Sequence, residues 1–223
     1  MQAYFTMLKA PLVVHASREQ ASLIRIGQGF TAGLSNNESV SMLRRAASVL
    51  LPLALAAGFA PTAHAALPVG HAAPPISLQA SMGGKEFSFS LADALKKGPV
   101  VVYFYPAAFT PGCTIEAHDF ADAMDDFHAL GATVIGVSMD PIDKLDKFSV
   151  SECRSRFAVA ADTDGAVASA YDAKMALKAH ATRTSYVIAP DGRIVMSYSD
   201  KAPDEHVTRS LAAVRALKDG KSG

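Results

Sequence analysis

Two long apolar runs dominate the pattern of hydrophobic and polar positions along the chain. The first, VVVYFY at residues 100–105, is bounded by prolines, and the second is ATVIGVSMD at residues 132–140. Both are rich in β-branched or aromatic residues and lack polar alternation, which is typical of strands buried on both faces of a sheet. We expect the first of them to be a central strand.

Apolar residues at helical intervals separate these two runs. Acidic residues lie on the opposite side of the pattern, and Gly131 ends it. The apolar positions that recur are Ile115, Phe120, Met124, Phe127 and Leu130. This spacing predicts an amphipathic helix over residues 112–130.

Further strands and helices are indicated on either side of this unit. Before the first apolar run, we expect a strand near Ile76, a strand at 86–90 after a Gly-Gly turn, and a short helix closed by Gly98. After the second run, we expect a helix at 141–153 and a strand at 157–162 followed by a turn at 163–165. The chain should end with a hairpin at 184–199, which turns around residues 190–192, and a helix at 203–218. Strands and helices alternate along this part of the chain. The pattern therefore predicts an α/β fold with a central mixed β-sheet flanked by helices on both faces.

Composition and motifs restrict the classes of function. Half of the 223 residues are apolar, 19% are charged and the formal net charge is zero, as in a folded globular protein. Because no basic stripe interleaved with aromatics occurs, we expect no nucleic-acid partner. The sequence has neither a glycine-rich phosphate loop nor closely spaced histidines of a zinc site, so we expect no cofactor and no metal.

Residues 42–65 have the pattern of a targeting segment. MLRRAASVLLPLALAAGFAPTAHA contains two arginines, an apolar run and the small-residue ending Ala63-His64-Ala65, which together are typical of a secretory signal peptide. The apolar run is interrupted by Pro52 and is shorter than the roughly 20 residues of a spanning helix. We expect cleavage after Ala65 and export, to the periplasm in a bacterium; an uncleaved membrane anchor is the alternative.

Residues 1–41 have no clear hydrophobic period, and their short apolar stretches are scattered among turn-forming residues. Our hypothesis is that Met42 is the natural start and that this stretch is a non-native or disordered extension. The mature protein would then be a single domain at residues 66–223.

The candidate chemistry centres on Cys113, in the stretch FTPGCTIEAHDF at residues 109–120. The predicted elements place this thiol in the first turn of a helix that follows a buried strand. Unpaired backbone N–H groups and the positive end of the helix dipole stabilise a thiolate there, which makes a better nucleophile at neutral pH. The carboxyl end of a central strand is also where ligand crevices form. On the cysteine count alone, however, a static disulfide between Cys113 and Cys153 is the default for an exported domain.

The residues around Cys113 favour the nucleophile. YFYPAAFTPGCT contains Pro106, Thr110 and Cys113 in the order P-x-x-x-T-x-x-C. In this the sequence resembles the peroxiredoxins, most closely subfamily Q, also called the bacterioferritin comigratory protein type. The resemblance runs from about Val69 to Leu217 and includes FYP, FTPGCT, Glu116, Phe120, D-x-D-G at 162–165 and RTSYVI-x-PDG at 183–192. It implies a thioredoxin-like fold and thiol-dependent reduction of hydrogen peroxide and organic hydroperoxides.

The resemblance also implies a role for each matching residue. Cys113 corresponds to the peroxidatic cysteine, whose thiolate attacks the peroxide and becomes a sulfenic acid. Thr110 corresponds to the hydroxyl that holds the peroxide, and Pro106 to the residue that shields the site from water. Arg183 corresponds to the arginine that pairs with the thiolate and stabilises the transition state. Taken singly, Thr110 is also compatible with a turn or capping residue, and Arg183 with a solvated residue at a strand edge.

One position departs from the commonest subfamily pattern. A second cysteine usually follows five residues after the first, and this sequence has His118 there. Because some members carry the resolving cysteine on a later helix, we expect Cys153 to attack the sulfenic acid of Cys113 and form an intramolecular disulfide. Cys153 as a buried bystander is the alternative, and for His118 we expect an exposed helical histidine.

Two other functions are compatible with the same cysteine. An exported thiol-disulfide oxidoreductase is the nearest, but the Cys-x-x-Cys motif of such enzymes is absent. A proline would also be expected before the strand at 184, and Ala181-Thr182-Arg183 stands there instead. A peroxide sensor or holdase would need the same reactive thiolate. The partners implied by the resemblance are a peroxide and a thioredoxin-like or other thiol reductant, with no membrane contact after signal cleavage, and the mature domain is expected to be a monomer.

Overall fold

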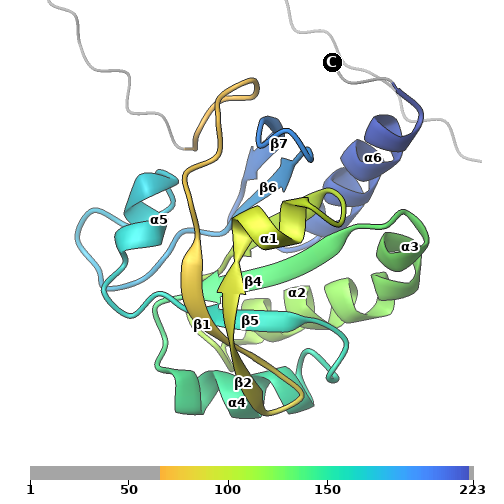
Figure 1. Cartoon of the computed structure of the whole chain (residues 1–223). Coiled ribbons are helices and arrows are strands. Elements are labelled where there is room, and N and C mark those ends of the chain that lie inside the picture. Colours follow the sequence, from red (N-terminus) through yellow and green to blue (C-terminus); the bar gives the residue numbers. More distant parts are fainter. Residues whose placement is uncertain (1–65, 221–223) are drawn as a thin grey trace, which may run out of the picture. The chain divides into compact units, whose positions relative to one another are not determined.

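A seven-stranded mixed sheet organises residues 66–220, the part of the chain that the computed structural model describes (Figure 1). Its strands are β1 (Ser77–Met82), β2 (Lys85–Ser90), β3 (Val100–Phe104), β4 (Thr133–Ser138), β5 (Ala158–Ala161), β6 (Thr184–Ile188) and β7 (Ile194–Ser199). Their order is β2-β1-β5-β4-β3-β6-β7. Strand β3 pairs in parallel with β4, and β4 with β5, whereas the other pairs are antiparallel. The predicted mixed sheet is confirmed.

Strand β3 lies inside the sheet, between β4 and β6, and its side chains are buried on both faces. Its residues are at most 1% exposed. Val101 and Tyr103 face one side of the sheet, and Val102 and Phe104 face the other, as the two-residue period of a strand requires. The expectation of a central strand buried on both faces is therefore confirmed.

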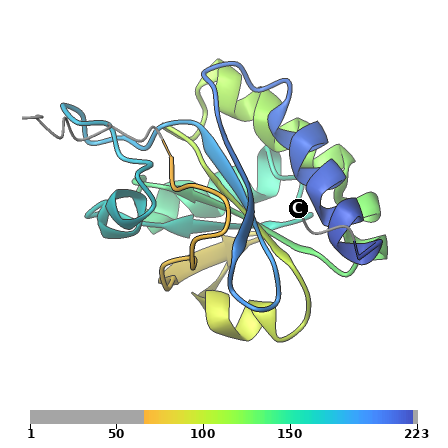
Figure 2. The ribbon, with the colours of Figure 1, turned by 90° about the horizontal axis from the view of Figure 1, so that it is seen from above.

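Helices cover both faces of the sheet. The helices are α1 (Leu91–Leu95), α2 (Pro111–Asp122), α3 (Met124–Ala129), α4 (Ile142–Ser151), α5 (Ala166–Ala170) and α6 (His206–Lys218). Buried residues of α2, α3, α4 and α6 join the core on the Tyr103 side, and those of α1 and α5 join the core on the Phe104 side. Figure 2 shows α2, α3 and α6 together on one side, with α5 on the other.

Three of the predicted helical boundaries were wrong. The expected helix at 112–130 is two helices that meet at Ala123, a turn residue with φ −86° and ψ −2°. The break leaves Phe120 and Phe127 in the same core, with their rings stacked at 6.1 Å. Helix α4 ends at Ser151, and α6 begins only at His206, because residues 203–205 form a turn that leads into it.

One helix was not predicted. Helix α5 has five residues, too few for its apolar spacing to be recognised. It begins after Gly165, whose φ of 69° favours glycine. The Asp162 carboxylate accepts hydrogen bonds from the amides of Val167 and Ala168 at 3.1 and 2.7 Å, so the acidic residue of the D-x-D-G motif supports the helix start.

The predicted turns were correct. The Gly83-Gly84 turn joins β1 to β2, and both glycines have positive φ, as a tight hairpin requires. The hairpin of β6 and β7 turns around residues 190–192, where Gly192 has a φ of 85°. The predicted signal peptide at 42–65 and the extension at 1–41 lie outside the described residues.

Candidate active site

Cys113 lies in the first turn of α2, just beyond the carboxyl end of β3. Thr110 is the N-cap residue of the helix and Pro111 its first residue, so the thiol is three residues from the cap. The Pro-Gly dipeptide permits this sharp start, since proline at the first helical position lacks only an N–H that would have no partner in the helix. The Cys113 side chain is 1% exposed and belongs to the core between α2 and the sheet. The predicted position of the thiol is confirmed.

The Arg183 side chain meets Cys113 from the neighbouring strand. Because Thr184 pairs with Phe104 in the antiparallel register of β6 and β3, Arg183 lies beside the end of β3. Its Nη2 donates a hydrogen bond to Cys113 Sγ at 3.6 Å, and its Nε donates to the carbonyl oxygen of Lys201 at 3.0 Å. The guanidinium is thus placed directly against the sulfur, as a charged hydrogen-bond donor. Arg183 is therefore not a solvated strand-edge residue.

Glu116 completes the surroundings of the guanidinium. It lies three residues after Cys113 on the same face of α2, is fully buried, and accepts a hydrogen bond from Arg183 Nη1 through Oε2. Burial raises the pKa of Glu116 to about 8, and the positive charge of Arg183 opposes this shift. Glu116 holds the guanidinium on the side opposite the Lys201 carbonyl, so the Arg183 fork is fixed from two directions.

His206, at the start of α6, lies behind Glu116. Its Nδ1 is 2.8 Å from Ser185 Oγ and 3.7 Å from Glu116 Oε1, and its Nε2 is 3.2 Å from the carbonyl oxygen of Asp200. Because that carbonyl can only accept, Nε2 carries the proton and Nδ1 accepts from the Ser185 hydroxyl. Burial lowers the pKa of His206 to about 4, so the imidazole is neutral at physiological pH.

Replacing His206 by glutamine is expected to destabilise the fold more at pH 7 than at pH 5. The pKa of His206 falls from 6.5 to about 4 on folding, so between these values the unfolded chain binds the extra proton. The stability contributed by the neutral ring is complete above pH 6.5 and is lost as the pH falls towards 4, a difference of about 2 kcal/mol between pH 7 and pH 5. Urea unfolding of wild type and His206→Gln at both pH values measures it. His128→Gln, at an exposed histidine of α3, is the matched control, and an equal cost of His206→Gln at both pH values would contradict the prediction.

The sequence reasoning missed His206 and Ser185 as parts of the site. Ser185 lies within a strand, just before its central residue. His206 begins a helix that was predicted to start three residues earlier. Neither residue belongs to a sequence motif that would mark it as part of a site. Their contact depends on how α6 packs against β6, which the pattern does not determine. Glu116 had a signal, because it follows Cys113 by three residues in a predicted helix.

Thr110 and Pro106 lie at the open side of the site. The Thr110 side chain is exposed, and its Oγ1 donates to the carbonyl oxygen of Ala107 at 2.9 Å instead of capping an amide of α2. Pro106 and Arg183 line a hollow of about 500 Å³ together with Met175, Thr182, Ser199, Asp200 and Lys201. Cys113 and Thr110 do not line this hollow, so it reaches the site only at Pro106 and Arg183.

Cys153 lies just past the end of α4 and is as buried as Cys113. Its side chain is 0% exposed, both cysteines are free thiols, and its amide donates to the carbonyl oxygen of Phe148 at 3.1 Å. Burial strongly raises the pKa of the Cys153 thiol, so it is a poor nucleophile in this conformation. The free thiols are at odds with a permanent Cys113 to Cys153 bridge.

His118 is not simply an exposed helical histidine. Its side chain is 36% exposed, and its Nε2 lies 3.0 Å from a carboxylate oxygen of Glu152, the residue before Cys153. The helix position that would carry a nearby second cysteine in the commonest arrangement therefore contacts the segment that carries Cys153.

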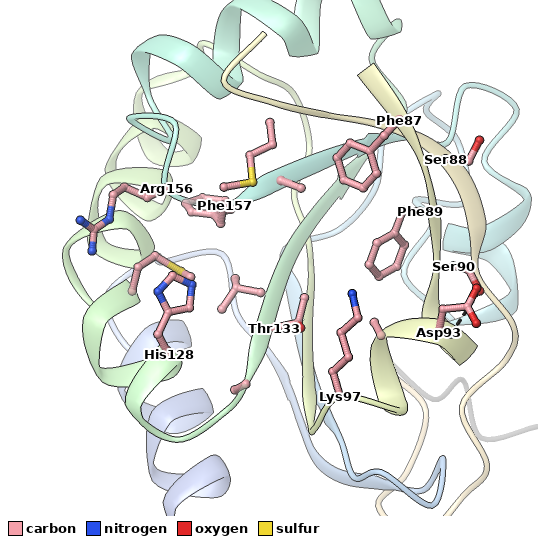
Figure 3. A pocket seen from close by; sticks show the side chains of 16 residues that line it. Phe87, Ser88, Phe89, Ser90, Asp93, Lys97, His128, Thr133, Arg156 and Phe157 are labelled. Carbon is pink, nitrogen blue, oxygen red and sulfur yellow. Dashed lines mark hydrogen bonds between the residues drawn. The ribbon is translucent and has the colours of Figure 1, made fainter. Parts of the chain in front are cut away.

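A second hollow, of about 370 Å³, lies where the parallel strands β4 and β5 begin (Figure 3). Phe87, Phe89 and Phe157 point into it, and Lys97 and His128 lie at its rim. Thr133, at the start of β4, also lines it, whereas Cys113 follows the end of the parallel neighbour β3. Neither cysteine lines this hollow, so it is separate from the thiol site.

Neither a metal centre nor a membrane span is found in the described part of the chain. Among residues 66–220, no three histidine, cysteine or acidic side chains are grouped so that they could hold a metal ion. Within the same residues, no helix has the length and apolar character to cross a bilayer.

Comparison with known proteins identifies what this arrangement is similar to. A family model described as AhpC/TSA family matches residues 69–197. Peroxiredoxin Bcp of Bacillus subtilis is 30% identical over 157 residues, which are 68% of this chain and 97% of the relative. Peroxiredoxin Bcp of Xanthomonas campestris is 30% identical over 123 residues, 52% of this chain and 76% of the relative. The crystal structure of peroxidoxin BcpB from Mycobacterium tuberculosis matches with a TM-score of 0.62 and 32% identity, and covers 68% of this chain and 98% of that chain.

Proposed function

The chain belongs to the AhpC/TSA family and is a peroxiredoxin of the Bcp or Q type, and on this basis we propose that it is a thiol-dependent peroxidase in which Cys113 is the reactive cysteine. The observation that carries the proposal is the contact of Arg183 Nη2 with the Cys113 sulfur in the first turn of α2. A buried cation and a helix N-terminus both face the sulfur, where they would stabilise negative charge in the transition state, and Arg183 also lines a hollow.

The first step oxidises Cys113 and reduces the peroxide. The Cys113 thiolate attacks one oxygen of the peroxide, a sulfur–oxygen bond forms, and the oxygen–oxygen bond breaks. The sulfur loses two electrons and becomes a sulfenic acid, while the departing oxygen takes up a proton and leaves as water or an alcohol. Arg183 faces the sulfur where negative charge passes to the peroxide oxygens, and it stabilises that charge in the transition state. Thr110 is proposed to hold the peroxide, and Pro106 to limit the access of water.

The second step joins Cys113 to Cys153. The Cys153 thiolate attacks the sulfenic sulfur, a disulfide forms, and hydroxide leaves as water after protonation. Because both thiols are buried, the first turn of α2 and the end of α4 must open locally before the sulfurs meet. A dithiol reductant of the thioredoxin class then exchanges with the disulfide, which restores both thiols and oxidises the reductant.

The number of turnovers tests whether the protein is an enzyme. Reduced protein is mixed with hydrogen peroxide or an organic hydroperoxide in hundredfold excess, with thioredoxin and its reductase as the electron supply. An enzyme consumes the peroxide many times over, whereas a sensor or holdase that uses the same cysteine would stop after one equivalent. Consumption of a single equivalent would therefore overturn the proposed function.

Replacing Cys153 by serine is expected to leave the first step intact and remove the second. Cys153→Ser should still form one sulfenic acid at Cys113 after one equivalent of peroxide, detected by a dimedone-type probe. Wild type should yield a Cys113–Cys153 peptide after non-reducing digestion, and the variant none. If peroxide-treated wild type gave no such peptide, Cys153 would be a bystander in a one-cysteine enzyme.

We also propose that the protein acts outside the cytoplasm, as a monomer. The support for export is the signal-like segment at residues 42–65, with its two arginines and apolar run. Mass spectrometry of the secreted or periplasmic fraction should give an N-terminus at Ala66; a start upstream of Ala65 would contradict cleavage. Light scattering of residues 66–223 should give the mass of a single chain, and the mass of a stable dimer would contradict the proposed monomer.

A further inference from the structure

The turn before α2 has a strained backbone. Phe109 has a φ of 66°, in the left-handed region that a bulky aromatic residue rarely occupies. Such a conformation persists only where surrounding contacts hold it in place, and it is common beside reactive groups. Phe109 directly precedes Thr110, so the contacts that hold the turn also determine where the Thr110 hydroxyl lies.

Asp140 provides the side-chain contact that holds this turn. Its Oδ2 accepts a hydrogen bond from the backbone N–H of Ala108 at 2.7 Å and another from Ser138 Oγ at 3.0 Å, and its Oδ1 accepts one from Lys144 Nζ at 2.7 Å. The Asp140 side chain is only 11% exposed. Hydrogen bonds to an ionised carboxylate are stronger than those between neutral groups, so this carboxylate holds the Ala108 amide firmly.

The anchored amide determines the orientation of the Thr110 hydroxyl. Residue 107 immediately precedes the anchored residue, and its carbonyl oxygen accepts from Thr110 Oγ1 at 2.9 Å. The amide of Thr110 points to the same carbonyl at 3.4 Å. If Ala108 moves, the Ala107 carbonyl moves with it, and the Thr110 side chain loses its partner.

The same carboxylate connects the turn to the helix that leads to Cys153. Lys144, which holds Oδ1, is in the first turn of α4. Further along α4, the ring of Phe148 packs edge-on against Phe109 at 5.2 Å, and the Phe148 carbonyl accepts from the Cys153 amide. The turn is therefore linked to α4 twice, through Asp140 to Lys144 and through Phe109 to Phe148.

We propose that Asp140 is a positioning residue that holds residues 107–110 in the form that receives the peroxide and ties them to α4. This inference rests on the proposed function. Disulfide formation requires the first turn of α2, which directly follows residues 107–110, and the end of α4 to open. Asp140 therefore sets the balance between reaction with peroxide and opening of the site. Without its carboxylate, the site opens more often and holds the peroxide less well.

Asp140→Asn tests this balance, since the substitution removes the charge at nearly constant size. In reduced protein without peroxide, iodoacetamide should alkylate the buried Cys113 about tenfold faster, because one charge-assisted hydrogen bond no longer resists opening. With peroxide, quenched-flow mass spectrometry should show sulfenic acid formation slowed about tenfold. A second peroxide converts sulfenic acid to sulfinic acid and water, and the share of Cys113 lost this way, relative to disulfide, should fall. Asp143→Asn, at the exposed acidic residue three positions later in α4, should leave all three unchanged.

Ser138→Ala provides a second variant should Asp140→Asn fail to fold. It removes the hydroxyl that orients Oδ2 and should change the same three quantities in the same directions, by about threefold. Unchanged alkylation and unchanged partition in the folded variant, even with a lower melting temperature, would overturn the inference and leave Asp140 a purely structural residue. If wild type formed no sulfenic acid, the proposed function would fail, while alkylation would still decide whether Asp140 holds the turn.

Discussion

Cys113→Ser is expected to lower the rate of peroxide reduction by at least about 1,000-fold, the scale seen when the nucleophile of a covalent mechanism is removed. A serine hydroxyl stays protonated at neutral pH, and Arg183 would then face a neutral oxygen where the sulfur lies 3.6 Å away. Serine fills nearly the same space as cysteine in the core, so the change concerns the chemistry more than the packing. The initial rate of peroxide consumption with an excess of thiol reductant measures the effect.

The second buried cysteine provides a matched control for this result. Cys153→Ser makes the same chemical change at a residue that is equally buried, and it should retain the single-turnover reaction with peroxide. If Cys113→Ser kept more than a tenth of the wild-type rate while Cys153→Ser lost it, the roles of the two cysteines would have to be exchanged.

The parts of the fold that follow from local pattern could be predicted, and this includes the immediate surroundings of Cys113. The VVVYFY run is continuous, apolar and bounded by prolines, and it forms an inner strand of the sheet, between β4 and β6. The helix that carries Cys113 was expected to begin at residue 112, one residue after its start at Pro111. By contrast, the break at Ala123 and the short helix α5 have weak local signals, since they depend on packing against the sheet or on a single capping carboxylate.

The long-range contacts of the site could not be derived from spacing. Arg183 lies 70 residues from Cys113, and only the register of β6 against β3 brings them together; the family resemblance pointed to this pair, whereas the hydrophobic pattern did not. His206 and Asp140 had no motif to mark them. Both are held by hydrogen bonds to groups distant in the sequence, His206 to Ser185 and Asp140 to Ala108. Polar residues of this kind are recognised only when the neighbouring elements are in place.

Arg183→Lys is expected to slow the reaction of Cys113 with peroxide about 100-fold, the scale for removing one transition-state donor. The guanidinium now serves three partners at once: the Cys113 sulfur through Nη2, Glu116 through Nη1 and the Lys201 carbonyl through Nε. A lysine ammonium is a point charge on a flexible stem and lacks the planar fork that these positions match. Quenched-flow measurement of sulfenic acid formation isolates this step from reduction by the thiol partner.

Arg193→Lys is the control for the chemical change itself, because Arg193 lies in the exposed β6–β7 hairpin, with a side chain that is 67% exposed. It should react with peroxide at the wild-type rate. The Arg183 guanidinium fills the space above the helix start. Gly112 has no side chain there, and a Cβ at this position would come within 2.9 Å of Arg183 Nη2. Since charge alone is preserved in Arg183→Lys, an unchanged rate would mean that a nearby positive charge suffices and that the fork does not contribute to catalysis. A large loss with the sulfur still reactive towards iodoacetamide would show that the fork acts on the peroxide oxygens and not merely on the thiolate.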